Sequence, residues 1–411
     1  MFHRKLLLLA ALLIPATAGA VDLPTLKLYG FINAELEWAR AIGGPTPYTS
    51  RVRLADGNSR LGIFGSYDIT ANTQFNVQLE GFLNNFEQGG INDLGQTATL
   101  ESRNTYVAVV DKRFGQLIAG YYDNAYRALV GTGGNFGGNL GLTEMGLDLW
   151  NNTSAGVSGG FSSLFGRGEA RLKNSIHYRS PDLFGVRVSA SYGLDETLES
   201  GGRRDHISAA ALYTLAGFKL GIGFDHQANT GIDSDALFRG TGMNTAAVND
   251  VSTNYYKIIA SYYFSPTGTY VGAGYERSVF GYANFIPPVQ GVVLTPLIAG
   301  TSSQGGAMVS AAQRLGPDLT FMGSFGKLGG LSNAIVGSGA DYAATQFSLG
   351  AKYAMTDAFM VYVYFTRIDN KPQQNLNLGA PIFSNQSGTG SAYLAPGDKP
   401  TAGGLGMIAR F

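Results

Sequence analysis

The sequence contains no cysteine in its 411 residues. No disulfide can brace the fold, which excludes small disulfide-stapled scaffolds and favours a large hydrogen-bonded sheet. Charge is also scarce, because charged residues make up only 14% of the chain and balance at 29 basic and 29 acidic side chains. This balance gives no electrostatic case for nucleic acid as a partner.

Long hydrophobic runs are absent as well. After residue 20, no window holds about 18 uninterrupted apolar residues, so the sequence predicts no transmembrane helix. The first 20 residues combine a basic start, the apolar run Leu6–Ile14 and a small-residue Ala-Gly-Ala site. That order predicts a secretory signal peptide over residues 1–20 and a single mature domain over residues 21–411. Removing Arg4 and Lys5 leaves 27 basic against 29 acidic residues.

Histidine is rare, and the four histidines offer little chemistry. Ser175 and His177 are close in the sequence, but no acid that would orient the histidine accompanies them. No H-x-x-x-H spacing of a metal site occurs. We therefore predict no enzyme activity, no metal and no cofactor. His206 and His226 lie symmetrically about Ala216 in a predicted hairpin, and we expect them to be cross-strand neighbours at the outer rim.

Glycine and short alternating runs are abundant. The 58 glycines are about double the usual share of roughly 7%. In residues 73–84, "TQFNVQLEGFLN", apolar and polar side chains alternate, as in a strand with one apolar and one polar face. Sixteen such runs lie near residues 26–39, 59–69, 73–84, 101–110, 115–122, 172–180, 186–192, 205–215, 218–227, 252–264, 269–278, 305–314, 319–328, 344–353, 359–368 and 403–411.

The connections between these runs alternate in length. Short turns are predicted at residues 69–73, 111–115, 180–185, 215–217, 265–268, 315–319 and 355–358. Long loops rich in Gly, Ser, Asn and Pro are predicted near residues 41–57, 87–100, 123–168, 193–204, 228–250, 279–304, 329–343 and 369–401. Transmembrane barrels have this asymmetry, with tight periplasmic turns and longer external loops.

An all-β fold is thus predicted, a 16-stranded antiparallel transmembrane β-barrel with long external loops. The polar faces of the strands carry many Gln, Asn, Ser and Arg, which cannot fill a dry interior. Closing the sheet removes its edges and leaves a wet lumen. A soluble sandwich would stop at about 10 strands per sheet, and a β-solenoid would need a fixed repeat length.

Several segments, in this order, resemble the general diffusion porins of Gram-negative outer membranes, especially the β-proteobacterial branch. They are "LKLYGF", "SRLGIFG", "SRNTYVAV", "GQLIAGYYDNAYRALVG", "NFGG", "RLKNSIHYRSPDLFGV" and the terminal "ARF". The resemblance implies export through the periplasm to the outer membrane and a homotrimer in contact with lipid and lipopolysaccharide. It also implies passive diffusion of small hydrophilic solutes and ions. The third external loop, residues 123–168, would fold into the lumen as a constriction loop; the alternative is an external loop.

The same resemblance supplies candidate wall residues for the constriction. Arg60 in "SRLGIFG" and Arg103 in "SRNTYVAV" fall on the family's wall arginines. Arg171 is a candidate third, with Arg167 as its nearest rival. Glu80 has the parity of the lumen face.

The loop departs from the family's pattern. Asn135 precedes the "FGG" turn where many relatives carry a carboxylate, and Arg127 stands where an acid is often found. Glu144 and Asp148 are the remaining loop acids. The local balance therefore leans positive, and we expect a weakly selective, anion-leaning channel. One alternative is a substrate-specific channel for a small anion or sugar. A role of the long loops as surface adhesin or phage receptor is compatible with the passive channel.

Overall fold

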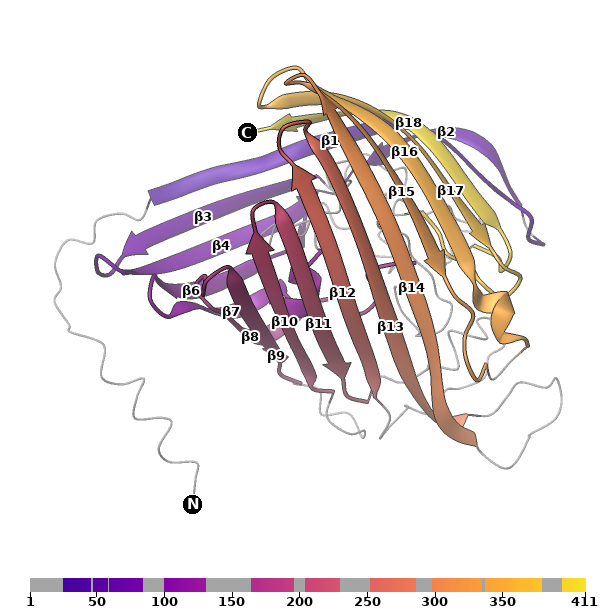
Figure 1. The fold of residues 1–411 in the computed structure, drawn as a ribbon, viewed down its shortest axis with the longest axis horizontal. Coiled ribbons are helices and arrows are strands. Elements are labelled where there is room, and N and C mark those ends of the chain that lie inside the picture. The colour runs from indigo at the N-terminus through magenta and orange to yellow at the C-terminus, as the bar shows by residue number, and fades with distance from the viewer. Residues whose placement is uncertain are drawn as a thin grey trace.

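The computed structural model describes residues 25–45, 47–57, 59–83, 100–130, 164–195, 204–229, 252–285, 298–334, 337–378 and 394–411. Most of them belong to one antiparallel sheet, which Figure 1 shows as a single wall of tilted strands. Two short helices, α1 (Ala125–Ala128) and η1 (Gly339–Tyr342), accompany the sheet. Within the ranges above, no helix is long and apolar enough to cross a bilayer.

The strands follow one another around the wall in chain order. They are β1 (Thr25–Ile42), β2 (Tyr48–Asp56), β3 (Arg60–Asp68), β4 (Thr73–Leu83), β5 (Leu100–Ser102), β6 (Thr105–Asp111), β7 (Gly115–Asp123), β8 (Arg171–Arg179), β9 (Val186–Gly193), β10 (His206–Leu215), β11 (Phe218–Gln227), β12 (Thr253–Phe264), β13 (Thr269–Phe285), β14 (Ile298–Leu315), β15 (Leu319–Leu328), β16 (Ala344–Ala354), β17 (Phe359–Asn370) and β18 (Lys399–Arg410).

The wall is a closed barrel of sixteen strands, as the sequence predicts. β2 and β3 both pair with β1, and β5 and β6 both pair with β4, so each pair is one interrupted strand. β18 returns to pair with β1. At this seam the backbone N–H groups of Gly30 and Phe411 each donate to the other's carbonyl, at 3.1 Å. Closure pairs the strand backbones without leaving an edge, which is what a bilayer requires of a spanning sheet.

Each strand separates an apolar outer face from a polar inner face. On β1, Ile32 and Leu36 are 41% and 55% exposed, whereas Asn33, Glu35 and Glu37 on the opposite face are buried. Large apolar side chains remain exposed all around the outer surface. A water-soluble protein would not leave so continuous an apolar belt uncovered, but lipid tails would cover it.

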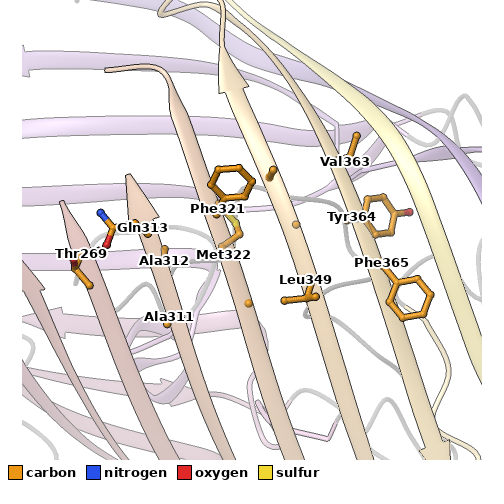
Figure 2. A pocket seen from close by; sticks show the side chains of 13 residues that line it. Thr269, Ala311, Ala312, Gln313, Phe321, Met322, Leu349, Val363, Tyr364 and Phe365 are labelled. Atoms are coloured by element: carbon orange, nitrogen blue, oxygen red, sulfur yellow. Dashed lines mark hydrogen bonds between the residues drawn. The ribbon is translucent and has the colours of Figure 1, made fainter. Parts of the chain in front are cut away.

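The outer belt is not smooth. A groove of about 710 Å³ crosses β14 to β17. Figure 2 shows Phe321, Leu349 and Phe365 along it, on three successive strands. Gly323 and Ala311 also line the groove, and their small size leaves room between the larger side chains.

The predicted phase of the turns is confirmed. Short turns join the strands at residues 69–72, 112–114, 180–185, 216–217, 265–268, 316–318 and 355–358. The C-terminus lies at the same end of the barrel as the β12–β13 and β14–β15 turns (Figure 1). The predicted signal peptide, residues 1–20, lies outside the described residues.

Two predicted long loops are wrong in part. Residues 41–57 contain β2, and in 279–304 β13 runs to Phe285 while β14 begins at Ile298. Gly and Ser in these stretches lower the local preference for strand. These residues still form strands, because hydrogen bonding to a neighbouring strand outweighs the weak strand preference of the individual residues.

The expected histidine pair is also wrong, by one residue. The β10–β11 turn contains two residues, Ala216 and Gly217, with φ of 45° and 87°. His206 therefore pairs with Gln227 rather than with His226. A shift of one residue reverses the face of a side chain, so the two histidines lie on opposite sides of the wall.

Candidate functional site

The wall is interrupted between β2 and β3 and between β5 and β6, on the two sides of β4 and at the same height of the barrel. An arginine lies at each interruption. Arg60 is the first residue after the β2–β3 break and pairs with Phe82 on β4. Arg103 lies in the β5–β6 break, where its backbone N–H donates to the carbonyl of Glu80 at 2.7 Å. Irregularities of this kind re-aim side chains out of the regular pleat.

Glu80 is the carboxylate between these two arginines. Arg103 Nε donates to Glu80 Oε1 at 2.8 Å, and the Tyr29 hydroxyl donates to Oε2 at 3.0 Å. The Arg60 guanidinium lies over the Phe31 ring, 4.5 Å from its centroid, and interacts electrostatically with Glu80. Among the described residues, Arg60 Nε has no hydrogen-bond partner.

Asp123 is a second carboxylate, at the end of β7. Arg171 Nε donates to Asp123 Oδ1 at 3.1 Å and to Asn104 Oδ1 at 2.9 Å. Asn104 Nδ2 donates to Asp123 Oδ2 at 3.0 Å. Arg127 Nε lies 2.9 Å from Asp123 Oδ1, as an ion pair without hydrogen-bond alignment. Burial lowers the pKa of Arg127, but Asp123 and Glu169 outweigh it and raise the pKa above its ordinary value.

These groups form one cluster with an excess of positive charge. Arg60 interacts with Arg171, and Arg103 with both Arg60 and Arg127. The structure thus brings together five of the residues predicted for the site: Arg60, Arg103, Arg127, Arg171 and Glu80. Three of the four guanidinium groups form ion pairs with the carboxylates of Glu80 and Asp123, and Arg60 interacts electrostatically with both carboxylates.

Other predicted residues lie elsewhere. Asn135, Glu144 and Asp148 fall outside the described residues. Arg167, the rival of Arg171, lies away from the cluster, where its guanidinium donates to Gln304 and sits 5.4 Å from the Phe280 ring centroid.

The lumen-facing Glu35 and Glu37 form a separate buried group. The hydroxyls of Tyr362 and Tyr364 donate to these carboxylates from β17, and Arg53 pairs with Glu37. Their charge is therefore engaged at the β1–β18 seam rather than beside the arginine cluster.

The first end of the segment 123–168 lies against the inner wall. The Asn124 side chain caps α1 by accepting from Arg127 N at 2.8 Å. The N–H groups of Ala125 and Tyr126 donate to Ser191 on β9 and to Ser208 on β10, both at 2.9 Å. The free N–H groups of the first helical turn thus bond to the wall.

The second end of the segment 123–168, residues 164–168 with the adjoining Glu169, contacts the inner wall at β12 and β13. The N–H groups of Gly166 and Arg167 donate to the Glu276 carboxylate on β13, at 2.9 and 3.1 Å. Glu169 pairs with Lys257 on β12, and the two residues are buried or nearly so. Contacts of both ends therefore reach from β9 to β13.

Glycines in the wall make room for these two ends. A Cβ at Gly223 on β11 would lie 2.8 Å from Leu129 Cδ1, and one at Gly274 on β13 would lie 2.5 Å from Phe165 Cζ. Both distances are too short for a side chain, so the glycines act as slots that Leu129 and Phe165 fill.

Ser175 and His177 are hydrogen-bonded, with 2.7 Å between Ser175 Oγ and His177 Nε2. The other ring nitrogen lies 2.8 Å from Ser191 Oγ rather than near a carboxylate, and both residues are buried. This network ties β8 to β9 and, through Ser191, to α1.

Sequence reasoning missed three members of the cluster: Tyr29, Asn104 and Asp123. Asp123 had a signal, because it precedes Arg127 by four residues, the spacing of neighbours on a helix. Tyr29 shares the parity of the lumen face. Asn104 had no signal, because its direction depends on the break between β5 and β6.

Comparisons with known proteins agree with this architecture. A family model described as Gram-negative porin matches residues 7–373. An anion-selective porin from Comamonas acidovorans is similar in structure, with a TM-score of 0.68, 16% identity and coverage of 94% of this chain and 99% of that chain.

Two further solved structures are similar. OmpF of Salmonella typhi, in complex with daunomycin, has a TM-score of 0.60 and 14% identity over 94% of this chain and 98% of that chain. The trimer form of OmpT from Vibrio cholerae has a TM-score of 0.58 and 14% identity over 95% and 100%. Among curated protein sequences, none matches the chain. At these identities the structural likeness concerns the fold.

Proposed function

The chain belongs to the Gram-negative porin family, and from that premise we propose that it is a general diffusion channel with a weak preference for anions. Its place is the outer membrane, and its solutes are small hydrophilic molecules and ions. The observation that carries the preference is the cluster of four arginines on two carboxylates. A net positive constriction favours anions over cations.

Modest charge differences are enough for such a preference. Two unit charges about 4 Å apart interact by roughly 4 kcal/mol at an effective dielectric of about 20. About 1.4 kcal/mol already corresponds to a tenfold ratio. Water and mobile ions screen the excess in the lumen, so we expect a weak rather than a strict preference.

The proposal includes an infolded third loop. Both described ends of the segment 123–168 bond to the inner wall, at Ser191 and Ser208 on one side and at Glu276 on the other. A loop anchored so would cross the lumen and narrow it. Irregular backbone is tolerated at membrane depth where water lines it. We also propose a homotrimer, as in the trimer form of the similar OmpT.

Reversing the charge of Arg60 and Arg103 together tests the preference. We expect the Arg60→Glu/Arg103→Glu variant to shift the zero-current potential in a KCl gradient toward the cation limit. Arg103 pairs with Glu80, so the double variant also breaks that ion pair. Arg60→Gln alone is therefore measured beside it, because it removes one charge and breaks no hydrogen bond of Arg60 Nε.

Lys327→Glu is the matched control, because Lys327 is exposed on the outer face of β15. It should leave the potential of the wild type unchanged. If correctly inserted Arg60 variants also keep that potential, the arginine cluster does not set selectivity.

Deletion of residues 131–141 tests the loop. We expect a folded barrel with higher single-channel conductance and weaker size exclusion, since the segment would obstruct the lumen without being part of the wall. Unchanged conductance would mean that the loop is external.

A further inference from the structure

Basic side chains gather on the inner face at the short-turn end of the barrel. Each lies within three residues of the short-turn end of its strand and shares the parity of the lumen face: Lys27, Arg179, Arg187, Lys219, Arg314, Lys352 and Arg410. Among the described strand residues of this inner zone, the one carboxylate is Asp68; Asp182, Asp318 and Asp357 lie in the adjoining turns. In a transmembrane barrel this end faces the periplasm.

Three of these residues line one hollow of about 690 Å³ on the inner wall. They are Lys219 on β11, Arg314 on β14 and Lys352 on β16. The remaining lining is mostly neutral, with the hydroxyl-bearing Thr214, Ser261, Tyr263, Tyr270 and Thr320 and one acid, Asp318.

The register sets the spacing within the hollow. Arg314 pairs with Thr320, and Thr320 pairs with Lys352, so the two basic residues are separated by two strand spacings. That separation is about 10 Å between backbones. Two long basic side chains at that distance can reach two anionic groups of one ligand. The Arg314 guanidinium also donates to the carbonyl of Pro317 at 2.6 Å, and this hydrogen bond holds the side chain toward the β14–β15 turn.

We propose that this hollow, named here the periplasmic anion site, binds a multiply charged oxyanion such as a phosphate compound. Lys219, Arg314 and Lys352 supply the charge, and the hydroxyl groups supply neutral donors. Clusters of lysine and arginine are the usual lining of anion and phosphate pores.

The site lies in series with the arginine cluster. An anion that has passed the constriction would meet a second basic zone before it reaches the periplasm. Weak binding at successive sites favours entry without preventing exit. This transport role rests on the proposed channel function, whereas the binding itself does not.

Titration calorimetry with inorganic pyrophosphate, on the full protein in detergent, tests the proposal. We expect the wild type to bind, and Lys219→Gln/Lys352→Gln to bind at least tenfold more weakly. Lys327→Gln removes one exposed outer charge and should bind as the wild type does. Arg60→Gln, in the constriction, should retain the binding.

Three results would overturn the periplasmic anion site. They are no binding to the wild type, wild-type affinity in the Lys219→Gln/Lys352→Gln variant, or loss of binding in Arg60→Gln instead. Native trimer or monomer mobility of each unheated variant on gels establishes that it is folded. A wild type that binds pyrophosphate but forms no conducting channels would refute the channel function and leave the site standing.

Discussion

Asp123 faces two arginines at once, and its carboxylate is one of the two that offset the positive charge of the cluster. Arg127 and Arg171 both approach its Oδ1, at 2.9 and 3.1 Å, while Asn104 donates to Oδ2. A buried carboxylate with three such partners stabilises the charged form of each arginine beside it. One side chain therefore contributes both to the stability of the cluster and to its net charge.

We predict that Asp123→Asn makes the channel more anion-selective and less stable. The variant keeps the shape of the side chain but loses the negative charge. This weakens hydrogen bonds to charged groups, each of which contributes about 1.5–3 kcal/mol to the free energy of unfolding. The zero-current potential in a KCl gradient and the midpoint of thermal unfolding measure the two effects.

Asp369→Asn is the control for that prediction. Asp369 pairs with Arg367 at 2.7 Å, but both side chains are more than two-fifths exposed. An exposed pair contributes about 0–1 kcal/mol. Equal losses of stability in the two variants would show that Asp123 contributes no more to stability than an exposed ion pair does.

Strand glycines decide how α1 sits in the barrel. α1 has only four residues and is too short to be stable by itself. Its position comes from the hydrogen bonds of Ala125 and Tyr126 to the wall and from the slot at Gly223 that Leu129 fills. A side chain in place of Gly223 would clash with Leu129, so α1 could not keep its present position.

We expect Gly223→Val to displace α1 and alter single-channel conductance. The new Cβ would lie 2.8 Å from Leu129 Cδ1 and 3.0 Å from Tyr126 Cδ2. Overpacking of this kind costs about 1–3 kcal/mol, which the thermal unfolding midpoint would register. In Gly65→Val the nearest atom is the flexible end of Leu26, at 3.2 Å, on the outer face. Identical conductance in both variants and the wild type would contradict a role of the slot.

The barrel as a whole has two unlike ends: one has the short turns, the beginning of β1 and the end of β18, and the other has the long connections. This asymmetry gives the molecule a direction in the membrane, because transmembrane barrels have short turns on the periplasmic side and longer loops outside. The basic inner zone belongs to the short-turn end and the arginine cluster lies nearer the middle.

A protease site inserted near Gly240 or Gly388 should be cleaved in intact cells, since both positions fall in long connections. A site near Pro317, in the β14–β15 turn, should be protected until the outer membrane is opened. Fluorescence or gel detection of the fragments measures this. The reverse pattern would mean that the barrel is oriented the other way.

The strand number, the phase of the turns and the lipid-facing side of each strand were determined by the sequence alone. All three follow from a period of two, which is a property of neighbouring residues: Ile32 and Leu36 must face lipid if Asn33 and Glu35 face water. The arginines at positions 60 and 103 could be assigned to the lumen for the same reason, with the family resemblance supplying their role.

Only the tertiary structure decided which side chains meet. Asp123 and Arg171 are joined across the β7–β8 pair, and Asn104 reaches both because the strand is broken beside it. The register of His206 depended on a turn of two residues rather than three, a difference that the alternation does not encode. Contacts between strands distant in sequence depend on breaks, bulges and register, and a shift of one residue reverses every face beyond it.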